Sequence, residues 1–139
     1  GMFRGLTEEI DFQGNSVLDV GCGTGDFANH LKRKRMVPSL LRGIDPIPEF
    51  VQEAQRTAPP WAEYAVCDPV AQPRTLGKRW DWIVISGVIQ NLNQGQAKRL
   101  LADCWRIARY GLVFSFLPTR KGERSWQRVR PCDPKDPQN

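Results

Sequence analysis

Short apolar runs alternate with segments of helical periodicity through most of this chain. The runs are long enough for buried strands, and the segments between them repeat apolar residues at the spacing of one helix face. The predicted strands cover residues 17–20, 40–44, 62–68, 82–85 and 110–117, and the predicted helices cover residues 3–11, 26–37, 50–58 and 97–108. Alternating strands and helices favour a parallel sheet with helices on both faces. We therefore predict an α/β fold, a three-layer α/β/α sandwich around a mostly parallel sheet of about five strands.

Breaking and capping residues mark several of these boundaries. Pro38 cannot continue the helix before it, and Pro59-Pro60 ends the next one. Asn93 and Gln96 have the spacing of a capping box, in which each side chain bonds the backbone of the other residue. The helix that follows carries an apolar stripe that includes Trp105, and we expect this stripe to belong to the core.

Residues 17–25 carry the clearest candidate chemistry. Asp19 lies near the end of an apolar strand, and glycines follow at positions 21, 23 and 25 before a helical pattern begins at Asp26. Such a turn brings unpaired N–H groups and the positive end of a helix dipole to the edge of the sheet. Glycines allow positive φ and let a ligand lie directly on the backbone. The segment predicts a ligand-binding loop, and the alternative is a tight turn without a ligand.

The spacing of these glycines narrows the choice of ligand. A dinucleotide motif G-x-G-x-x-G that starts at Gly21 needs a glycine where the chain has Asp26, and a P-loop needs a lysine that this loop lacks. The series Asp19-x-Gly21-x-Gly23-x-Gly25 instead resembles the first motif of class I S-adenosylmethionine-dependent methyltransferases. A site made of a carboxylate and a glycine backbone suits the sulfonium and ammonium of that cofactor better than it suits a pyrophosphate. The resemblance implies a Rossmann-like fold and S-adenosyl-L-methionine as the cofactor.

A carboxylate also follows the second predicted strand. Asp45 can accept two hydrogen bonds from a ribose diol, as an acidic residue does at this position in dinucleotide folds. The resemblance assigns the adenosine ribose to Asp45, and Pro46 and Ile47 beside it would pack on the adenine face. The alternative is a simple Asp-Pro turn.

The resemblance extends to the third and fourth predicted strands. It assigns the adenine amino group to Asp68, although Pro69 lacks the backbone N–H that often contacts the adenine ring at the next position. It places Ser86 next to the methionine part of the cofactor. The full set of predicted cofactor-binding residues is Asp19, Gly21, Cys22, Gly23, Asp45, Pro46, Asp68 and Ser86.

The sequence identifies no catalytic base. Gln90 and Asn91 stand where many small-molecule methyltransferases carry histidines, so the catalytic residues stay unassigned. Residues 86–89, Ser-Gly-Val-Ile, do not fit the [NDS]-P-P-[YF] motif of enzymes that methylate exocyclic amino groups of bases. A nucleic-acid acceptor is therefore less expected than a small molecule.

Polar residues follow four predicted strands at their carboxyl ends, where ligands bind in parallel sheets. We expect Asp19, Asp45, Asp68 and Ser86 to meet in one site. The resemblance covers residues 15–117, and the last two of the family's usual seven strands have no counterpart in the polar, basic tail of residues 118–139. Without them the fifth strand would be an exposed edge. Three alternatives follow: the sequence is cut short, the fifth strand pairs with its copy in a homodimer, or the tail covers it.

Composition describes an ordinary globular chain of 139 residues, which we interpret as a single domain covering residues 1–139. Gly1 before Met2 looks like a residue left by tag cleavage. The four cysteines are scattered and the chain has one histidine, so we predict neither a disulfide framework nor a metal site. The longest apolar stretches are too short for a membrane span, and we expect no membrane partner and a cytoplasmic location.

The net charge of +5 raises the question of a nucleic-acid partner. Basic residues gather in the run 32–35, Lys-Arg-Lys-Arg, and in the tail around Trp126. The run falls near a helix C-terminus, where cations complement the dipole, and a phosphate-binding patch is the alternative. Trp126 among arginines could stack on a base, or it could belong to a packed or disordered tail.

These observations predict an S-adenosylmethionine-dependent methyltransferase that acts on a small-molecule acceptor. The alternatives are a non-catalytic interaction module that keeps the cofactor fold, an RNA or DNA methyltransferase, and an NAD-dependent oxidoreductase, which the glycine spacing disfavours.

Overall fold

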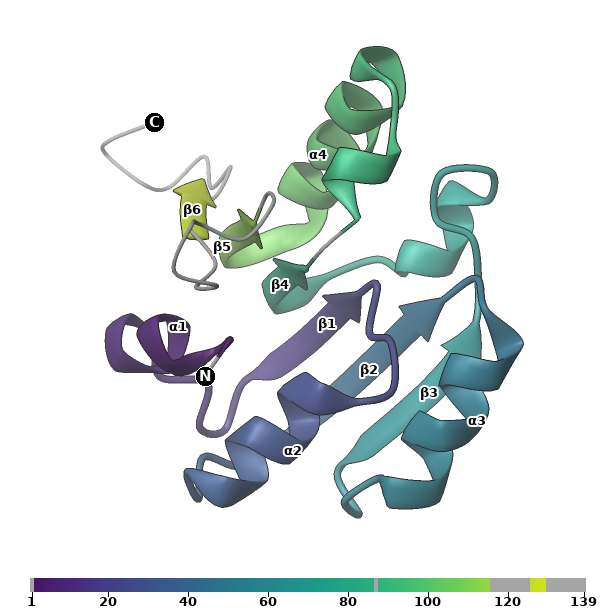
Figure 1. Cartoon of the computed structure of the whole chain (residues 1–139). Coiled ribbons are helices and arrows are strands. Elements are labelled where there is room, and N and C mark those ends of the chain that lie inside the picture. The colour runs from purple at the N-terminus through teal and green to yellow at the C-terminus, as the bar shows by residue number, and fades with distance from the viewer. Residues whose placement is uncertain (1, 87, 116–125, 130–139) are drawn as a thin grey trace.

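One six-stranded sheet organises the chain in the computed structural model, which describes residues 2–86, 88–115 and 126–129. The strands are β1 (Ser16–Val20), β2 (Leu40–Asp45), β3 (Ala62–Val66), β4 (Trp80–Ile85), β5 (Ala108–Ser115) and β6 (Trp126–Val129). Their spatial order is β3-β2-β1-β4-β5-β6, and only β6 runs antiparallel to its neighbour (Figure 1). The order reverses between β1 and β4, which is where open α/β sheets bind their ligands.

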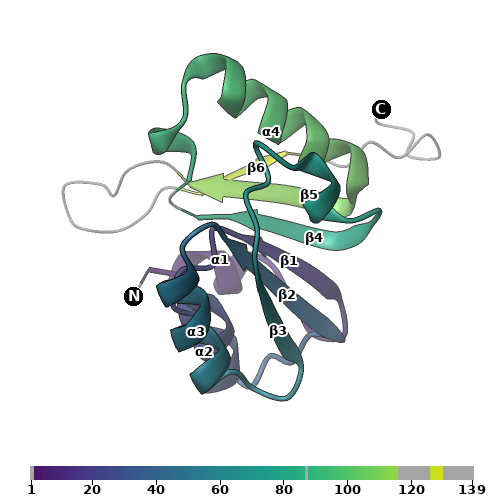
Figure 2. The ribbon, with the colours of Figure 1, turned by 90° about the vertical axis from the view of Figure 1, so that its right-hand side faces the viewer.

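Helices cover both faces of the sheet, as the sequence pattern predicts (Figure 2). The elements are α1 (Arg4–Glu9), α2 (Asp26–Arg33), α3 (Pro48–Thr57) and α4 (Gln94–Ile107), with the 3₁₀ turns η1 (Pro73–Leu76) and η2 (Ile89–Asn91). The first three helices pack on one face, and α4 packs on the other with η1 and η2. The three-layer α/β/α fold is confirmed.

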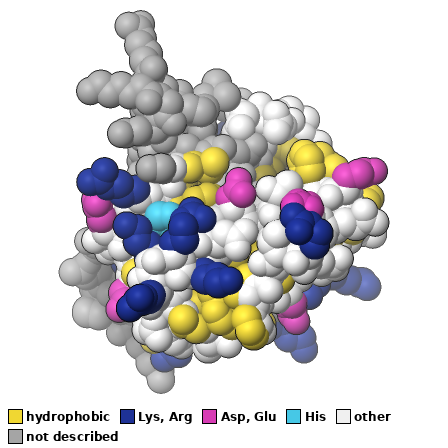
Figure 3. Space-filling model, turned by 60° about the horizontal axis from the view of Figure 1, so that its bottom comes forward, with side chains coloured by type: hydrophobic (Ala, Val, Ile, Leu, Met, Phe, Trp, Pro, Cys, Tyr) yellow, Lys and Arg dark blue, Asp and Glu magenta, His cyan; other side chains and the backbone are white. Residues whose placement is uncertain are grey.

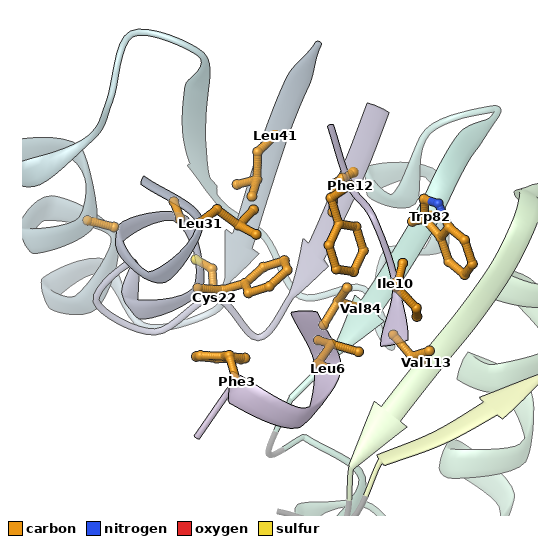
Figure 4. Close-up of a cluster of buried hydrophobic side chains, with 14 of the residues drawn as sticks. Phe3, Leu6, Ile10, Phe12, Cys22, Leu31, Leu41, Trp82, Val84 and Val113 are labelled. Carbon is orange, nitrogen blue, oxygen red and sulfur yellow. The ribbon is translucent and has the colours of Figure 1, made fainter. Parts of the chain in front are cut away.

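Alternation along the strands divides the apolar residues between two cores. Val17, Trp82 and Val84 point toward α1, α2 and α3, where they meet aromatic side chains such as Phe3 and Phe12 (Figure 4). The residues between them in sequence, such as Leu18 and Ile83, point to the α4 side. Because both faces of β1 and β4 are buried, these strands are mostly apolar, with Ser16, Asp19 and Asp81 as their polar members.

The capping box at the start of α4 is confirmed. The Asn93 side chain accepts from the Gln96 N–H at 2.8 Å, and the Gln96 side chain accepts from the Asn93 N–H at 3.1 Å. Together these bonds satisfy two backbone donors that a helix start leaves without intrahelical partners.

Three sequence expectations differ from the structure. Helix α2 ends at Arg33 instead of near Val37, because Arg35 adopts a left-handed conformation with φ of 56°. Strand β3 ends at Val66, so Asp68 lies in the following loop. Trp105 is 36% exposed, since the buried stripe of α4 is narrower than its apolar pattern and contains Leu100 and Cys104.

Of the alternatives that the sequence left open for strand β5, the structure shows that part of the tail covers its edge. Residues 112–115 pair with β6, which the sequence analysis placed in a polar tail. Pairing through this edge therefore no longer argues for a homodimer. Trp126 also packs inward, with its ring centroid 5.9 Å from that of Phe3 and its Nε1 donating to the Met2 carbonyl at 3.4 Å. The other tail residues, 118–125 and 130–139, lie outside the described residues.

Trp126→Ala tests whether this tail strand contributes to the fold. We expect the free energy of unfolding to fall by about 2 kcal/mol, because the indole is partly buried against the α1 side of the core. The matched variant Trp105→Ala removes the same side chain from an exposed position and should cost less than about 1 kcal/mol. Denaturant unfolding followed by circular dichroism measures both, and equal losses would contradict the assignment.

Candidate functional site

A pocket of about 510 Å³ opens at the carboxyl ends of the parallel strands. Six of the eight predicted cofactor-binding residues line it, namely Gly21, Gly23, Asp45, Pro46, Asp68 and Ser86. The other two, Asp19 and Cys22, are buried beneath the loop. The structure therefore brings together residues from four separate loops, as the sequence pattern predicts.

The glycine loop has the backbone conformation that its composition predicts. Gly21, Gly23 and Gly25 all have positive φ, at 78°, 54° and 90°. A Cβ at Gly21 would also overlap Cγ2 of Val88, so this glycine is required by space as well as by conformation. Strand β2 holds the start of the loop, since the N–H groups of Gly21 and Cys22 both donate to the Ile44 carbonyl at 2.9 and 3.0 Å.

Asp45 ties two loops together at the rim of the pocket. Its Oδ2 accepts from the Gly23 N–H at 3.0 Å, and its Oδ1 accepts from the Ile47 N–H at 2.9 Å. A carboxylate oxygen can accept more than one hydrogen bond, so both atoms keep acceptor capacity toward the pocket. The sequence analysis weighed ligand binding by Asp45 against a simple Asp-Pro turn. The structure shows the turn contact to Ile47 and adds a bond that shapes the glycine loop.

Asp68 is exposed at the pocket wall and also organises its own loop. Its Oδ1 accepts from the N–H groups of Val70 and Ala71 at 3.0 and 3.2 Å, which is a common turn arrangement for aspartate. Ser86 completes the rim on the β4 side, where its hydroxyl donates to the Gly21 carbonyl at 3.5 Å. The two residues thus line the same pocket from separate loops.

Apolar side chains that the sequence analysis did not assign to the site also line the pocket. They include Phe50, which is 41% exposed, Val70 and Leu92, and they join Ile47, which the sequence analysis did place against the adenine. The sequence analysis counted Phe50 only as part of an amphipathic helix. A signal was present, because Phe50 lies in the first turn of α3, which directly follows the Asp45 loop.

Asp19 is the most unusual group near the pocket. It is fully buried, and neither carboxylate oxygen has a hydrogen-bond partner among the described residues. Burial, followed by the nearby carboxylates of Asp45 and Asp26, raises its pKa to about 7. This concentration of acidic groups is electrostatically suited to a cation.

The side chain of Cys22 belongs to the hydrophobic core. It is 6% exposed, and burial, followed by the nearby Asp19 and Asp45, raises the pKa of its thiol (Figure 4). A protonated thiol is a poor nucleophile, so Cys22 contributes its loop backbone and not sulfur chemistry. No group of three or more metal-ligating side chains occurs within the described part of the chain.

A second pocket, of about 620 Å³, lies between α2 and the residues Met2 and Phe3 that precede α1. His30 lines it, but its Nε2 bonds the Thr7 hydroxyl at 2.9 Å and burial lowers its pKa, so this histidine is a neutral structural group. Lys32 and Arg33 surround it on a basic surface at the end of α2 (Figure 3). Both side chains are exposed, and they complement the negative end of the helix dipole.

The comparisons with known proteins agree with this geometry. The model of a methyltransferase-domain family matches residues 17–111. None of the curated proteins matches the chain in sequence. None of the helices in the described ranges is long and apolar enough to cross a membrane.

Solved structures share the fold at low sequence identity. Magnesium protoporphyrin IX methyltransferase from Synechocystis PCC 6803 is 24% identical with a TM-score of 0.67, over 84% of this chain and 56% of that one. An S-adenosylmethionine-dependent methyltransferase from Mesorhizobium loti is 18% identical with a TM-score of 0.67, over 92% of this chain and 64% of that one. Phosphoethanolamine N-methyltransferase 1 from Haemonchus contortus is 16% identical with a TM-score of 0.69, over 86% of this chain and 26% of that one. This chain therefore spans less than two thirds of each relative.

Asp19→Asn tests the electrostatic state of the buried carboxyl. The pKa of Asp19 rises from 3.8 to about 7 on folding, so the folded chain holds more protons between these values and loses stability as pH rises through them. Asparagine carries no such penalty. The difference in unfolding free energy, variant minus wild type, should therefore grow by roughly 2–3 kcal/mol from pH 5 to pH 8.

Denaturant unfolding of the ligand-free protein at several pH values measures this difference. Glu49→Gln, an exposed change on α3, is the control and should give a difference that hardly moves with pH. A constant difference for Asp19→Asn would show that Asp19 ionises near its ordinary pKa.

Proposed function

This chain belongs to the class I S-adenosylmethionine-dependent methyltransferases, and from that premise we propose that it transfers a methyl group from S-adenosylmethionine to a small-molecule acceptor. The cofactor would occupy the pocket at the carboxyl ends of the strands. The whole enzyme's acceptor and activity are part of this proposal, because the chain spans only part of its structural relatives.

The acidic surroundings of the glycine loop carry the proposal. Asp19 lies buried beneath the loop without a partner in the described chain, and Asp45 lies at its rim. S-adenosylmethionine brings a sulfonium and an ammonium, which such a site favours. A dinucleotide would bring its pyrophosphate to the same carboxylates, so this charge pattern argues against an NAD-dependent oxidoreductase.

The residues of the pocket divide naturally between the two halves of the cofactor. Asp45 and Asp68 would hold the ribose and the adenine amino group, and Ile47 offers an exposed apolar face to the adenine ring. Gly21, Gly23 and Ser86 would surround the methionine half.

When bound, the cofactor supplies an electrophilic methyl group, so the protein's main contribution is to align the acceptor and exclude water. Val88, Asn91 and Leu92 also line the pocket, and they would border an acceptor beside the methionine half. We assign no general base.

A small acceptor is supported by the structural relatives, whose described substrates include a magnesium porphyrin and phosphoethanolamine. The basic surface around Lys32 and Arg33 favours a nucleic-acid acceptor as the second candidate. A cytoplasmic setting is supported by three free thiols, those of Cys22, Cys67 and Cys104.

Asp45→Asn tests the cofactor assignment. The change places an amide donor against the Gly23 N–H or removes an acceptor from the ribose, so the affinity for S-adenosylhomocysteine should fall at least about tenfold. Isothermal titration calorimetry measures the affinity, with Glu49→Gln as the control on the adjacent exposed turn. Absence of binding to the wild type would refute the proposal.

A turnover assay separates the remaining alternatives. Transfer of a labelled methyl group to small carboxylates, amines or azole compounds supports the proposed function, and binding without transfer to any acceptor supports a non-catalytic module. RNA that binds with an affinity falling steeply with salt, and becomes labelled, supports the nucleic-acid alternative.

A further inference from the structure

Tyr64 is a buried polar residue that the proposed function does not use. Its hydroxyl, like both carboxylate oxygens of Asp19, is buried without a hydrogen-bond partner among the described residues. Native proteins leave very few buried polar groups unsatisfied, so two such groups beneath one binding loop require an explanation.

The sheet register places these two groups on the same side. Asp19 on β1 is aligned with Gly43 on β2, which is aligned with Tyr64 on β3. Aligned residues of parallel strands point to the same face, so all three positions face α2 and α3.

Gly43 opens the path between them. A Cβ at this position would overlap ring atoms Cδ1 and Cε1 of Tyr64 and would lie 2.8 Å from Cβ of Cys22. The tyrosine ring therefore lies over the bare backbone of β2 and extends toward β1.

The Tyr64 hydroxyl lies at the far end of the glycine loop. A Cβ on Gly25 would be 3.2 Å from this oxygen, so the phenol contacts the residue that caps α2. Tyr64 thus reaches from β3 to the underside of the loop, next to the buried carboxyl.

Among the residues that the structure describes, the titratable groups that interact with Asp19 are all acidic. They are Asp45 at the end of β2, Asp26 on α2, Cys22 in the loop and Tyr64 itself. Burial raises the pKa of the Tyr64 phenol, and Asp19 raises it further, so the hydroxyl keeps its proton and can act as a donor. The Cys22 thiol is directed instead to the Gly23 carbonyl, at 3.6 Å.

We propose that Tyr64 is a positioning residue of the cofactor site, whose hydroxyl donates a hydrogen bond to the Asp19 carboxylate when that group ionises to receive the cationic amino-acid half of the cofactor. The proton leaves Asp19 for the solvent, so cofactor binding below neutral pH releases one proton. This inference rests on the proposed function, and it adds a residue from β3 to the charge balance beneath the loop.

Tyr64→Phe tests the proposal through the pH dependence of binding. Loss of a hydrogen bond to a charged group should raise the pH at which Asp19 ionises by about one unit. The affinity for S-adenosylhomocysteine, which keeps the ammonium, should therefore fall about tenfold near pH 6 and less than about twofold at pH 8.5. A role in packing alone would reduce the affinity equally at both pH values.

Tyr110→Phe is the matched control, because Tyr110 is the other tyrosine of the chain and is 40% exposed on β5. Titration calorimetry over pH 5.5–8.5 should give the wild-type profile for this variant. A pH-independent loss, or no loss, in Tyr64→Phe would overturn the proposal.

A second measurement separates this inference from the proposed function. The ¹³C carboxyl shift of Asp19, identified by its absence in Asp19→Asn, reports ionisation in the ligand-free protein. Its midpoint should rise in Tyr64→Phe and not in Tyr110→Phe. If the wild type binds no cofactor but the Asp19 midpoint is higher in Tyr64→Phe than in the wild type, only the proposed function is refuted. If the wild type binds the cofactor but the midpoint is the same in Tyr64→Phe, the role of Tyr64 is refuted.

Discussion

A carboxylic acid buried without a hydrogen-bond partner in the described chain, at the end of strand β1, is the constraint on which the site depends. The charged groups of the described residues that shift the pKa of Asp19 are the carboxylates of Asp45 and Asp26. Ionisation at this position is unfavourable until a cation arrives, because burial and like charges both favour the neutral acid. The ligand-free protein is therefore less stable at alkaline pH, where Asp19 is ionised. A cationic ligand would offset the cost of that buried negative charge.

The backbone around Asp19 converts this charge into a shaped pocket. The glycine loop can turn above the carboxyl because its three glycines adopt positive φ, and Asp45 holds the middle of the loop through the Gly23 N–H. The two carboxylates have different tasks, because Asp45 accepts hydrogen bonds from the loop backbone and Asp19 accepts none in the described chain. Gly43, which belongs to no loop, matters equally, since its missing side chain lets Tyr64 approach from β3.

The parts of the fold that follow from local pattern could be predicted well. Apolar runs located five of the six strands, and the Asn93 capping box located the start of α4. Strand β6 was missed because four residues with two polar members carry little periodic signal, and their strand conformation depends on pairing with β5. Trp105 was assigned to the core for a related reason, since the helical pattern says which residues share a face but not how wide a stripe the sheet covers.

The sequence by itself determined the order of strands and helices, the positive-φ glycine loop and the acids that follow successive strands, because each depends on residues close together in the chain. It thereby located six residues that do line one pocket. Only the tertiary structure decided that Phe50 and Gln96 join that pocket, that Cys22 turns into the core, and that Tyr64 lies over Gly43 toward Asp19. These arrangements depend on the register between strands and on the packing of helices against them, which no short stretch of sequence encodes.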